Sequence, residues 1–144
     1  KKRRRRWEED GCLGASSSML AIASPEGALL GAVFWWPHDL VGPPGGCFEL
    51  GCMVLPERRG QGVGTAAQRA LGDYLFANTL ANRIQALTGV DNTAERRSLE
   101  RAGFQLEGIL RGAGFLGGRW RDGALYARLR ADPDTSDRSS PDPL

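Results

Sequence analysis

Short apolar runs separated by turn residues fill the first third of the chain. Runs at 18–23 and 28–36 flank the turn 24–27, in which proline fixes one φ angle and glycine accepts a positive one. A third run at 48–55 follows a loop at 37–46 that is rich in proline and glycine. Runs of this length and spacing predict a β-hairpin followed by a third strand.

Helical spacing replaces this pattern after residue 60. One apolar face of a helix of about four turns is predicted, and its residues are Val63, Ala66, Ala67, Ala70, Leu71, Tyr74 and Leu75. A second helix is expected to begin at Asn92, a good N-cap, with Glu95 completing a variant of the capping box. It runs through Ala102, and Gly103 with Phe104 gives a Schellman-like stop.

The remaining apolar runs predict three more strands. They lie at 83–90, about 104–115 and 120–129, and the last two turn at Gly117-Gly118. The order is therefore β-β-β-α-β-α-β-β. The strand–helix–strand unit makes a right-handed crossover between parallel strands, and hairpins make the rest. The expected fold class is α/β with a mixed sheet.

The length of 144 residues indicates one domain, which we place at residues 1–130. Residues 131–144 hold three prolines and almost no large apolar residue, and are expected to form a disordered tail. No apolar run approaches 18 residues, and no secretory signal follows the basic start. We therefore expect a cytoplasmic protein without a membrane partner.

Charge and cysteine content exclude further classes of site. Three cysteines and one histidine at these spacings make a poor metal site, so no metal is expected, and the cysteines are interpreted as small buried hydrophobes. The net charge is only +2. A nucleic-acid partner is disfavoured because the one basic run, Lys1–Arg6, is more simply a solvated segment. Nucleic-acid binding through that run stays an open alternative.

Three glycines alternate in the turn between the third strand and the first helix, in the sequence Arg58-Arg59-Gly60-Gln61-Gly62-Val63-Gly64-Thr65. Glycine lets backbone approach a ligand closely, and free amides at a helix N-terminus bind anions. A phosphate group is the natural ligand. The lysine of a P-loop is missing after Gly64, and Thr65 stands where the Rossmann fingerprint needs its third glycine. A ligand-free turn is the remaining alternative.

Four segments in order resemble the GNAT acetyltransferases, and most closely their RimJ/RimL-like branch. Arg59-x-x-Gly62-x-Gly64 is similar to the family's pyrophosphate signature, and the segment 49–56 is similar to the strand before it. Asn92 followed by the segment 100–104 is similar to the second motif, and the segment 106–111 to the stretch that follows it.

The resemblance implies a GNAT-like fold and transfer of an acetyl group from acetyl-CoA to an amine. The backbone of Met53, Val54 and Leu55 would pair with the pantetheine arm, and Asn92 would bind it as well as cap its helix. The pyrophosphate would lie on the turn residues Arg59, Gly60, Gln61, Gly62, Val63, Gly64 and Thr65. The acceptor would be a protein N-terminal α-amine, such as a ribosomal one, or a small-molecule amine.

Glu49 is the candidate general base. It is the one carboxylate in an otherwise apolar strand, and a carboxylate is costly to bury without a purpose. The alternative is a surface position at the edge of that strand. By resemblance, this side chain would accept the proton of the attacking amine or orient the substrate.

Two departures from the family pattern leave alternatives open. The family's usual donor of a proton to the departing thiolate is a tyrosine or a serine, and Leu99 and Glu95 stand at these two positions. Glu95 is interpreted as a helix cap rather than as an acid. Ser98 would be a weak substitute donor. By resemblance, the family's first strand and helix are also expected to be missing from this sequence, which would then be either a fragment or a shortened member of the family. A non-catalytic acyl-CoA-binding or regulatory module is therefore the alternative function.

Homodimers are common in the branch, and Trp35-Trp36 would serve such an interface or pack the core.

Overall fold

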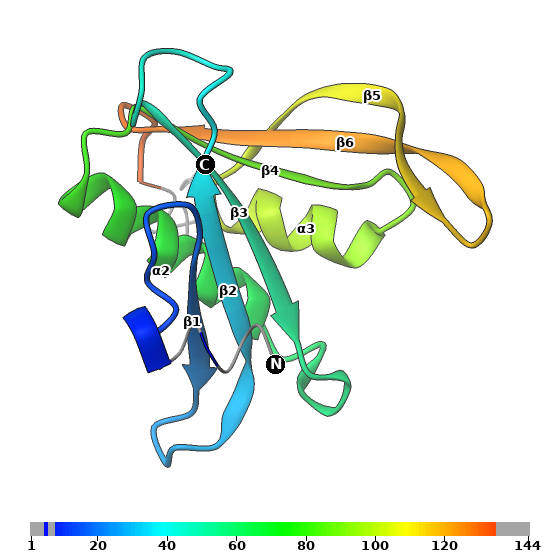
Figure 1. Cartoon of the computed structure of the whole chain (residues 1–144). Coiled ribbons are helices and arrows are strands. Elements are labelled where there is room, and N and C mark those ends of the chain that lie inside the picture. The colour runs from blue at the N-terminus through cyan, green and yellow to red at the C-terminus, as the bar shows by residue number, and fades with distance from the viewer. Residues whose placement is uncertain (1–4, 6–7, 135–144) are drawn as a thin grey trace, which may run out of the picture.

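The computed structural model describes residue 5 and residues 8–134, and shows one mixed sheet against which the helices α2 and α3 pack (Figure 1). In chain order its elements are β1 (Ser18–Ala23), β2 (Leu29–Pro37), β3 (Cys47–Val54), η1 (Pro56–Arg58), α2 (Val63–Asn78), β4 (Arg83–Gly89), α3 (Thr93–Arg101), β5 (Gln105–Leu116) and β6 (Arg119–Leu129). The predicted order β-β-β-α-β-α-β-β is confirmed. In space the strands follow the order β1-β2-β3-β4-β6-β5.

The parallel strands β3 and β4 pair over only three residues each. Their register joins Cys47 with Arg83, Phe48 with Ile84 and Glu49 with Gln85, and no pairing continues beyond. β3 nevertheless remains paired with β2 on its other side as far as Val54, and β4 remains paired with β6 as far as Gly89. The sheet therefore opens between the C-terminal halves of its two central strands.

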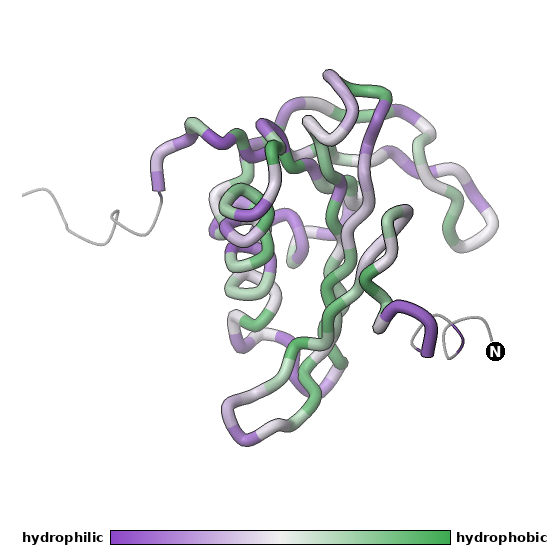
Figure 2. Tube along the Cα trace, turned by 60° about the vertical axis from the view of Figure 1, so that its left-hand side comes forward, coloured by the Kyte–Doolittle hydropathy of each residue, from purple (hydrophilic) through white to green (hydrophobic). Residues whose placement is uncertain are grey.

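Both helices pack against the same face of the sheet and share one core. Leu71 and Leu75 of α2 and Leu99 of α3 are buried with residues of the inner strands. The colouring by hydropathy in Figure 2 shows the apolar positions concentrated along the central strands and the inner sides of the helices. Side chains on a strand alternate between the faces. Phe48, Leu50 and Cys52 point toward the helices, which places Glu49 and Met53 on the opposite face.

The predicted buried face of α2 is partly wrong. Ala66, Ala70 and Tyr74 are exposed, whereas Gln68 and Gly72 are buried. Gln68 satisfies its amide inside the protein, as shown below. At Gly72 a Cβ would come within 2.9 Å of the Arg128 guanidinium, so this position brings β6 close to the helix. Close approach and internal hydrogen bonding, rather than hydropathy alone, set the orientation of the helix.

The caps of α3 agree with the sequence at both ends, with one correction. The Asn92 side chain accepts a hydrogen bond from the Glu95 amide at 3.3 Å. At the other end the amides of Gly103 and Phe104 donate to the carbonyls of Glu100 and Leu99, and Gly103 has φ of +96°. This is a complete Schellman motif. The reciprocal half of the capping box is absent, because the Asn92 amide donates to the carbonyl of Gly89.

Three further expectations concern burial and the chain ends. Trp35 is buried in the core and Trp36 is half-buried, so the pair is not an exposed patch. Cys12 and Cys47 are buried as expected, and Cys52 is half-buried. The basic run Lys1–Arg6, apart from Arg5, and residues 135–144 of the expected tail lie outside the described residues. Within the described part of the chain, no helix has the length and apolarity needed to cross a bilayer.

Candidate active site

The glycine turn leaves the first amides of α2 without an internal partner. Gly60 and Gly62 have φ of +73° and +78°, a conformation that glycine adopts freely. The first bond within the helix runs from the Ala66 amide to the Gly62 carbonyl, at 3.0 Å. The amides of residues 63–65 therefore have no carbonyl one turn below them. The N-cap is Gly62, which has no side chain to accept from these amides, and the first turn holds no acidic residue.

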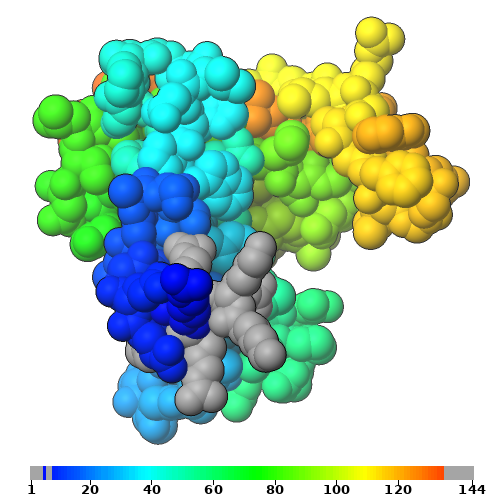
Figure 3. All heavy atoms as spheres, in the orientation of Figure 1, coloured from blue at the N-terminus to red at the C-terminus, as the bar shows by residue number. Residues whose placement is uncertain are grey.

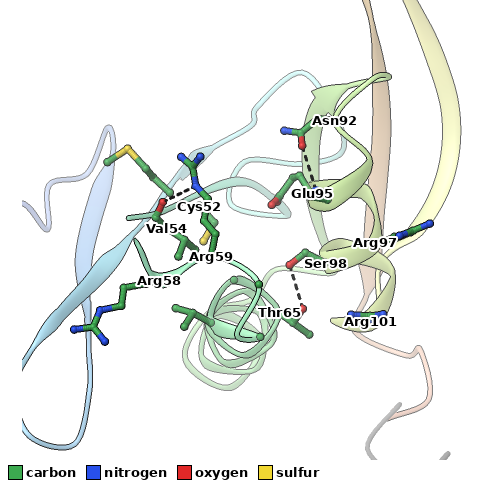
Figure 4. A pocket seen from close by; sticks show the side chains of 16 residues that line it. Cys52, Val54, Arg58, Arg59, Thr65, Asn92, Glu95, Arg97, Ser98 and Arg101 are labelled. Carbon is green, nitrogen blue, oxygen red and sulfur yellow. Dashed lines mark hydrogen bonds between the residues drawn. The ribbon is translucent and has the colours of Figure 1, made fainter. Parts of the chain in front are cut away.

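A groove of about 530 Å³ begins at these amides and runs between β3 and α3 (Figure 4). Nine of the predicted cofactor-binding residues line it: Met53, Val54, Arg59, Gly60, Gly62, Val63, Gly64, Thr65 and Asn92. Leu55 and Gln61 do not line the groove. The Leu55 amide donates to the carbonyl of Leu30 on β2, and Gln61 is exposed in the turn. The remaining lining residues are Cys52, Arg58, Ala94, Glu95, Arg97, Ser98 and Arg101.

Four arginines make the groove basic. Arg58 and Arg59 precede the glycine turn, and Arg97 and Arg101 lie one helical turn apart on α3. Figure 4 shows Arg58 pointing away from α3, whereas Arg59 folds back toward β3. The Arg59 Nε donates to the Val54 carbonyl at 3.2 Å. Positive charge therefore lies on both sides of the open amides, as an anionic ligand with several phosphates requires.

A small polar network closes the floor of the groove. The hydroxyls of Thr65 and Ser98 lie 3.2 Å apart, and Gln68 Nε2 donates to Ser98 Oγ and to the Gly64 carbonyl, each at 3.1 Å. A Cβ at Gly64 would come within 3.2 Å of Ser98 Oγ. Glycine at this position therefore lets the first turn of α2 approach α3 closely, which fixes the groove's narrow end.

Glu95 and Cys52 face the groove from opposite sides (Figure 4). Burial raises the pKa of the Glu95 carboxyl above its ordinary 4.5, and a hydrogen bond with the Gln68 side chain partly offsets this rise. Burial also raises the pKa of the Cys52 thiol to about 12, with a smaller contribution from the charge of Glu95. Burial therefore makes the charged form of each group less favourable than it is in water.

The structure places Glu49 at the point where β3 and β4 part, and outside the groove. Its side chain is 18% exposed, accepts a hydrogen bond from Gln85 Nε2 at 2.9 Å, and lies 3.4 Å from His38 Nδ1. Because Glu49 points to the sheet face opposite the helices, a group that reaches through the opening from the groove would approach it from the other side. The predicted base is thus separate from the predicted cofactor residues but adjacent to the opening between them.

The sequence analysis did not predict a place in these sites for several residues. His38 and Gln85 hold Glu49, and Arg83 continues the polar chain by donating to Gln85 Oε1 at 3.1 Å and pairing with Glu107. Alternation along the strand 83–89 could have put Arg83 and Gln85 on the face of Glu49. The arginines of α3 share one helical face through their spacing of four, but only the fold shows that this face borders the glycine turn.

The groove and the parted strands define a class of protein, and comparison with known proteins agrees. Residues 2–105 match the family model described as "Acetyltransferase (GNAT) domain". This chain belongs to the GNAT acetyltransferase family. The spermidine N-acetyltransferase of Vibrio cholerae, solved with CoA and spermine, has the same fold: its TM-score is 0.77 at 20% identity, over 91% of this chain and 75% of that one.

Two curated proteins of Bacillus subtilis are similar in sequence. The "Probable N-acetyltransferase YjcK" is 34% identical over 85 residues, and the "Putative ribosomal N-acetyltransferase YdaF" is 33% identical over 84 residues. These matches cover 59% and 58% of this chain. They cover 47% and 46% of the two relatives, so the matched part spans about half of their length.

Proposed function

We propose that this chain is an acetyl-CoA-dependent N-acetyltransferase that moves an acetyl group to a primary amine within a ternary complex. The observation that carries the proposal is a single arrangement. The open amides of α2 lie at one end of a basic groove, and the groove follows a β3 edge that has lost its partner strand. An anionic head and an extended amide-bearing arm fit such a site together.

The residues present fit acetyl-CoA in three places. The amides of residues 63–65, with Arg59, would hold the pyrophosphate. The free edge of β3 at Met53 and Val54 would pair with the pantetheine amides as an added strand would, after Arg59 releases the Val54 carbonyl. Asn92 borders the groove with its side-chain amide. Bound there, acetyl-CoA supplies the thioester whose carbonyl the amine attacks.

Glu49 would act on the acceptor from the other face of the sheet. Attack requires an amine that has lost its proton, and a carboxylate within reach, directly or through one water, accepts that proton. Gln85 and His38 fix the orientation of this carboxylate. Acetyl donor and amine would thus approach the opening from opposite faces, and the two sites need not compete for space.

The acceptor is a primary amine of either a protein N-terminus or a small molecule. The names of the similar proteins suggest the first probes, a peptide with a free α-amine for the ribosomal class and spermine for the polyamine class. Both belong in one panel, because the fold likeness alone does not distinguish them.

Calorimetric titration with acetyl-CoA tests the cofactor half of the proposal. We expect micromolar binding by the parent chain. Gly62→Asp should weaken it at least tenfold more than Gly62→Asn, because the two side chains match in shape and both tolerate positive φ, but only aspartate repels a phosphate. Circular dichroism of both variants controls for folding. Absence of binding by the parent chain, or equal binding by the two variants, contradicts the proposed site.

Turnover tests the catalytic half. Glu49→Gln keeps the shape and the oxygen that Gln85 contacts, so we expect kcat to fall about 10²-fold with little change in the affinity for acetyl-CoA. Glu57→Gln is the matched control, because it removes the same charge from an exposed residue outside the groove. Thiol release with the amine panel is the measurement. Tight acetyl-CoA binding without turnover on any acceptor would instead support the non-catalytic module.

A further inference from the structure

Glu95 is the one acidic residue among those that line the groove. It projects from the first turn of α3 toward Cys52 on β3, between the open amides of α2 and Asn92 (Figure 4). A carboxylate so placed would oppose the binding of an anionic ligand. Four arginines line the same groove and attract an anion. The presence of a carboxyl group among them therefore requires an explanation.

Burial makes the charged form of Glu95 less favourable than it is in water. A carboxylate in the first turn of a helix is ordinarily stabilised by the helix dipole and keeps its charge. Here burial outweighs that effect and raises the pKa of the Glu95 carboxyl. The titratable groups facing it are Cys52 on β3, whose thiol stays neutral, and Arg59 from the turn, which is held at the Val54 carbonyl. Arg97 and Arg101, on its own helix, lie farther along the groove's rim.

An unsatisfied acceptor beside Glu95 points the same way. Gln68 is fully buried, and its Nε2 donates to Ser98 and to the Gly64 carbonyl. Its Oε1 is buried with no hydrogen-bond partner among the described residues. A buried amide oxygen without a donor is costly. The Gln68 side chain also hydrogen-bonds with Glu95, which favours the charged carboxylate and offsets only part of the effect of burial. The O–H of a neutral Glu95 would give Oε1 the donor that it lacks, so the orphaned oxygen favours the neutral acid.

We propose that Glu95 is held as a carboxylic acid in the resting protein and gives its proton to the thiolate that leaves in acetyl transfer. This inference rests on the proposed function. The amine nitrogen bonds to the thioester carbonyl carbon, the carbon–sulfur bond breaks, and its electron pair stays on sulfur. Glu95 protonates the sulfur and becomes a carboxylate. The proton lost by nitrogen goes to Glu49, and each carboxyl later returns to its starting state by exchange with water.

A stability measurement on the free protein tests the first half. A carboxyl with a raised pKa in the folded state costs no stability below its unfolded pKa, near 4.5. The cost grows as the pH rises from there to the folded-state pKa and is constant above it. Glu95→Gln should therefore have a higher urea midpoint than the parent chain at pH 8, with the difference disappearing toward pH 4. Glu57→Gln, which removes an exposed carboxylate, should show no such difference. A Glu95→Gln variant no more stable than the parent at pH 8 overturns the proposal.

A pH profile tests the second half. The measured reaction is thiol release from saturating acetyl-CoA, with the best amine of the panel and with water alone, because both break the same bond. In the parent chain kcat should fall as the pH rises through the pKa of Glu95, since only the acid form donates. Glu95→Gln should lower kcat about 10²-fold, lose that alkaline limb, and bind acetyl-CoA within threefold of the parent.

The outcomes separate the two proposals. Normal binding and turnover by the parent, with Glu95→Gln within threefold of it in kcat, overturn the role of Glu95 alone. A Glu95→Gln variant that loses acetyl-CoA affinity in proportion to its rate, with its alkaline limb retained, also overturns it, because the residue is then structural. A parent chain that neither binds nor cleaves acetyl-CoA overturns the proposed function and the role of Glu95 together.

Discussion

At the scale of single residues, Cys52 is the thiol that lines the groove. It would carry the acetyl group if transfer went through an acetyl-enzyme intermediate. Burial raises the pKa of its thiol to about 12, so at neutral pH nearly all of it is protonated. Only the thiolate is a nucleophile. A neutral thiol at this position agrees with the proposed direct transfer from thioester to amine, in which Cys52 is only part of the wall.

This leads to a prediction about Cys52. At pH 8 its alkylation by iodoacetamide should be at least 100-fold slower than that of an unperturbed thiol, because its thiolate fraction is smaller by more than that factor. Peptide mapping by mass spectrometry gives the rate at Cys52, and the urea-unfolded chain is the control. An acetylated Cys52 peptide after incubation with acetyl-CoA would show that the thiol is a nucleophile after all.

The sequence located those residues whose chemistry is local. The glycines at 60, 62 and 64 and the N-cap Asn92 were predicted because a turn, an anion and a helix start each require a residue type at a fixed spacing. Glu49 stood out as a lone charge in an apolar strand. For Glu95 the sequence favoured a cap over an acid, because the proposed role as an acid depends on burial against Cys52 and on Gln68, 27 positions away in the chain.

At the scale of elements, the end of α3 is where local rules and the fold agree most closely. Gly103 has φ of +96° and ends the helix, and its position delivers Phe104 to the core. Nearby, Tyr126 of β6 donates to Glu100 at 2.8 Å and accepts from Arg96 at 3.1 Å. The helix that presents Glu95 and Asn92 is therefore held at its C-terminal end by its glycine stop and by β6.

Gly103→Ala should lower the free energy of unfolding by about 1–2 kcal/mol, because an alanine at positive φ is strained. Gly108→Ala is the control. A Cβ at Gly108 meets nothing within 4 Å and its φ is not positive, so its effect should stay within about 0.5 kcal/mol. Urea denaturation of the three proteins gives the comparison. Equal losses from both substitutions would mean that the Schellman geometry does not stabilise the helix end.

One other feature of these elements, the buried face of α2, could not be predicted from the sequence pattern. The strand and helix bounds were predicted to within a few residues, since apolar runs and turn residues mark them. The face that α2 buries was not, because alanines at 66 and 70 fit an apolar stripe equally well, while Gln68 is buried only through partners that α3 brings.

At the scale of the whole molecule, the decisive feature is the order of the strands. Insertion of β6 between β4 and β5 makes β4 an inner strand of the sheet, yet β3 and β4 keep only three paired residues each. A crossover between parallel strands was predicted from the order of elements. The opening between those strands could not be predicted from their sequences, because no local pattern in either strand marks the loss of pairing.

The β5–β6 hairpin is a second feature of this scale, and the sequence did not predict its shape. Figure 3 shows it standing out from the rest of the molecule. Two register shifts interrupt its pairing, at 106–108 and 110–114. Near its tip the exposed rings of Phe115 and Trp120 meet edge to face, with centroids 5.2 Å apart. The strands were located correctly, whereas the bulges that shape this arm depend on pairing partners.

A crystal structure of the chain with CoA tests the central claim most directly. The account predicts a pyrophosphate within hydrogen-bonding distance of the amides of residues 63–65. It also predicts a pantetheine arm alongside Met53 and Val54, and a sulfur atom near Glu95. A CoA molecule bound elsewhere on the chain, with Arg59 still donating to the Val54 carbonyl, would contradict it.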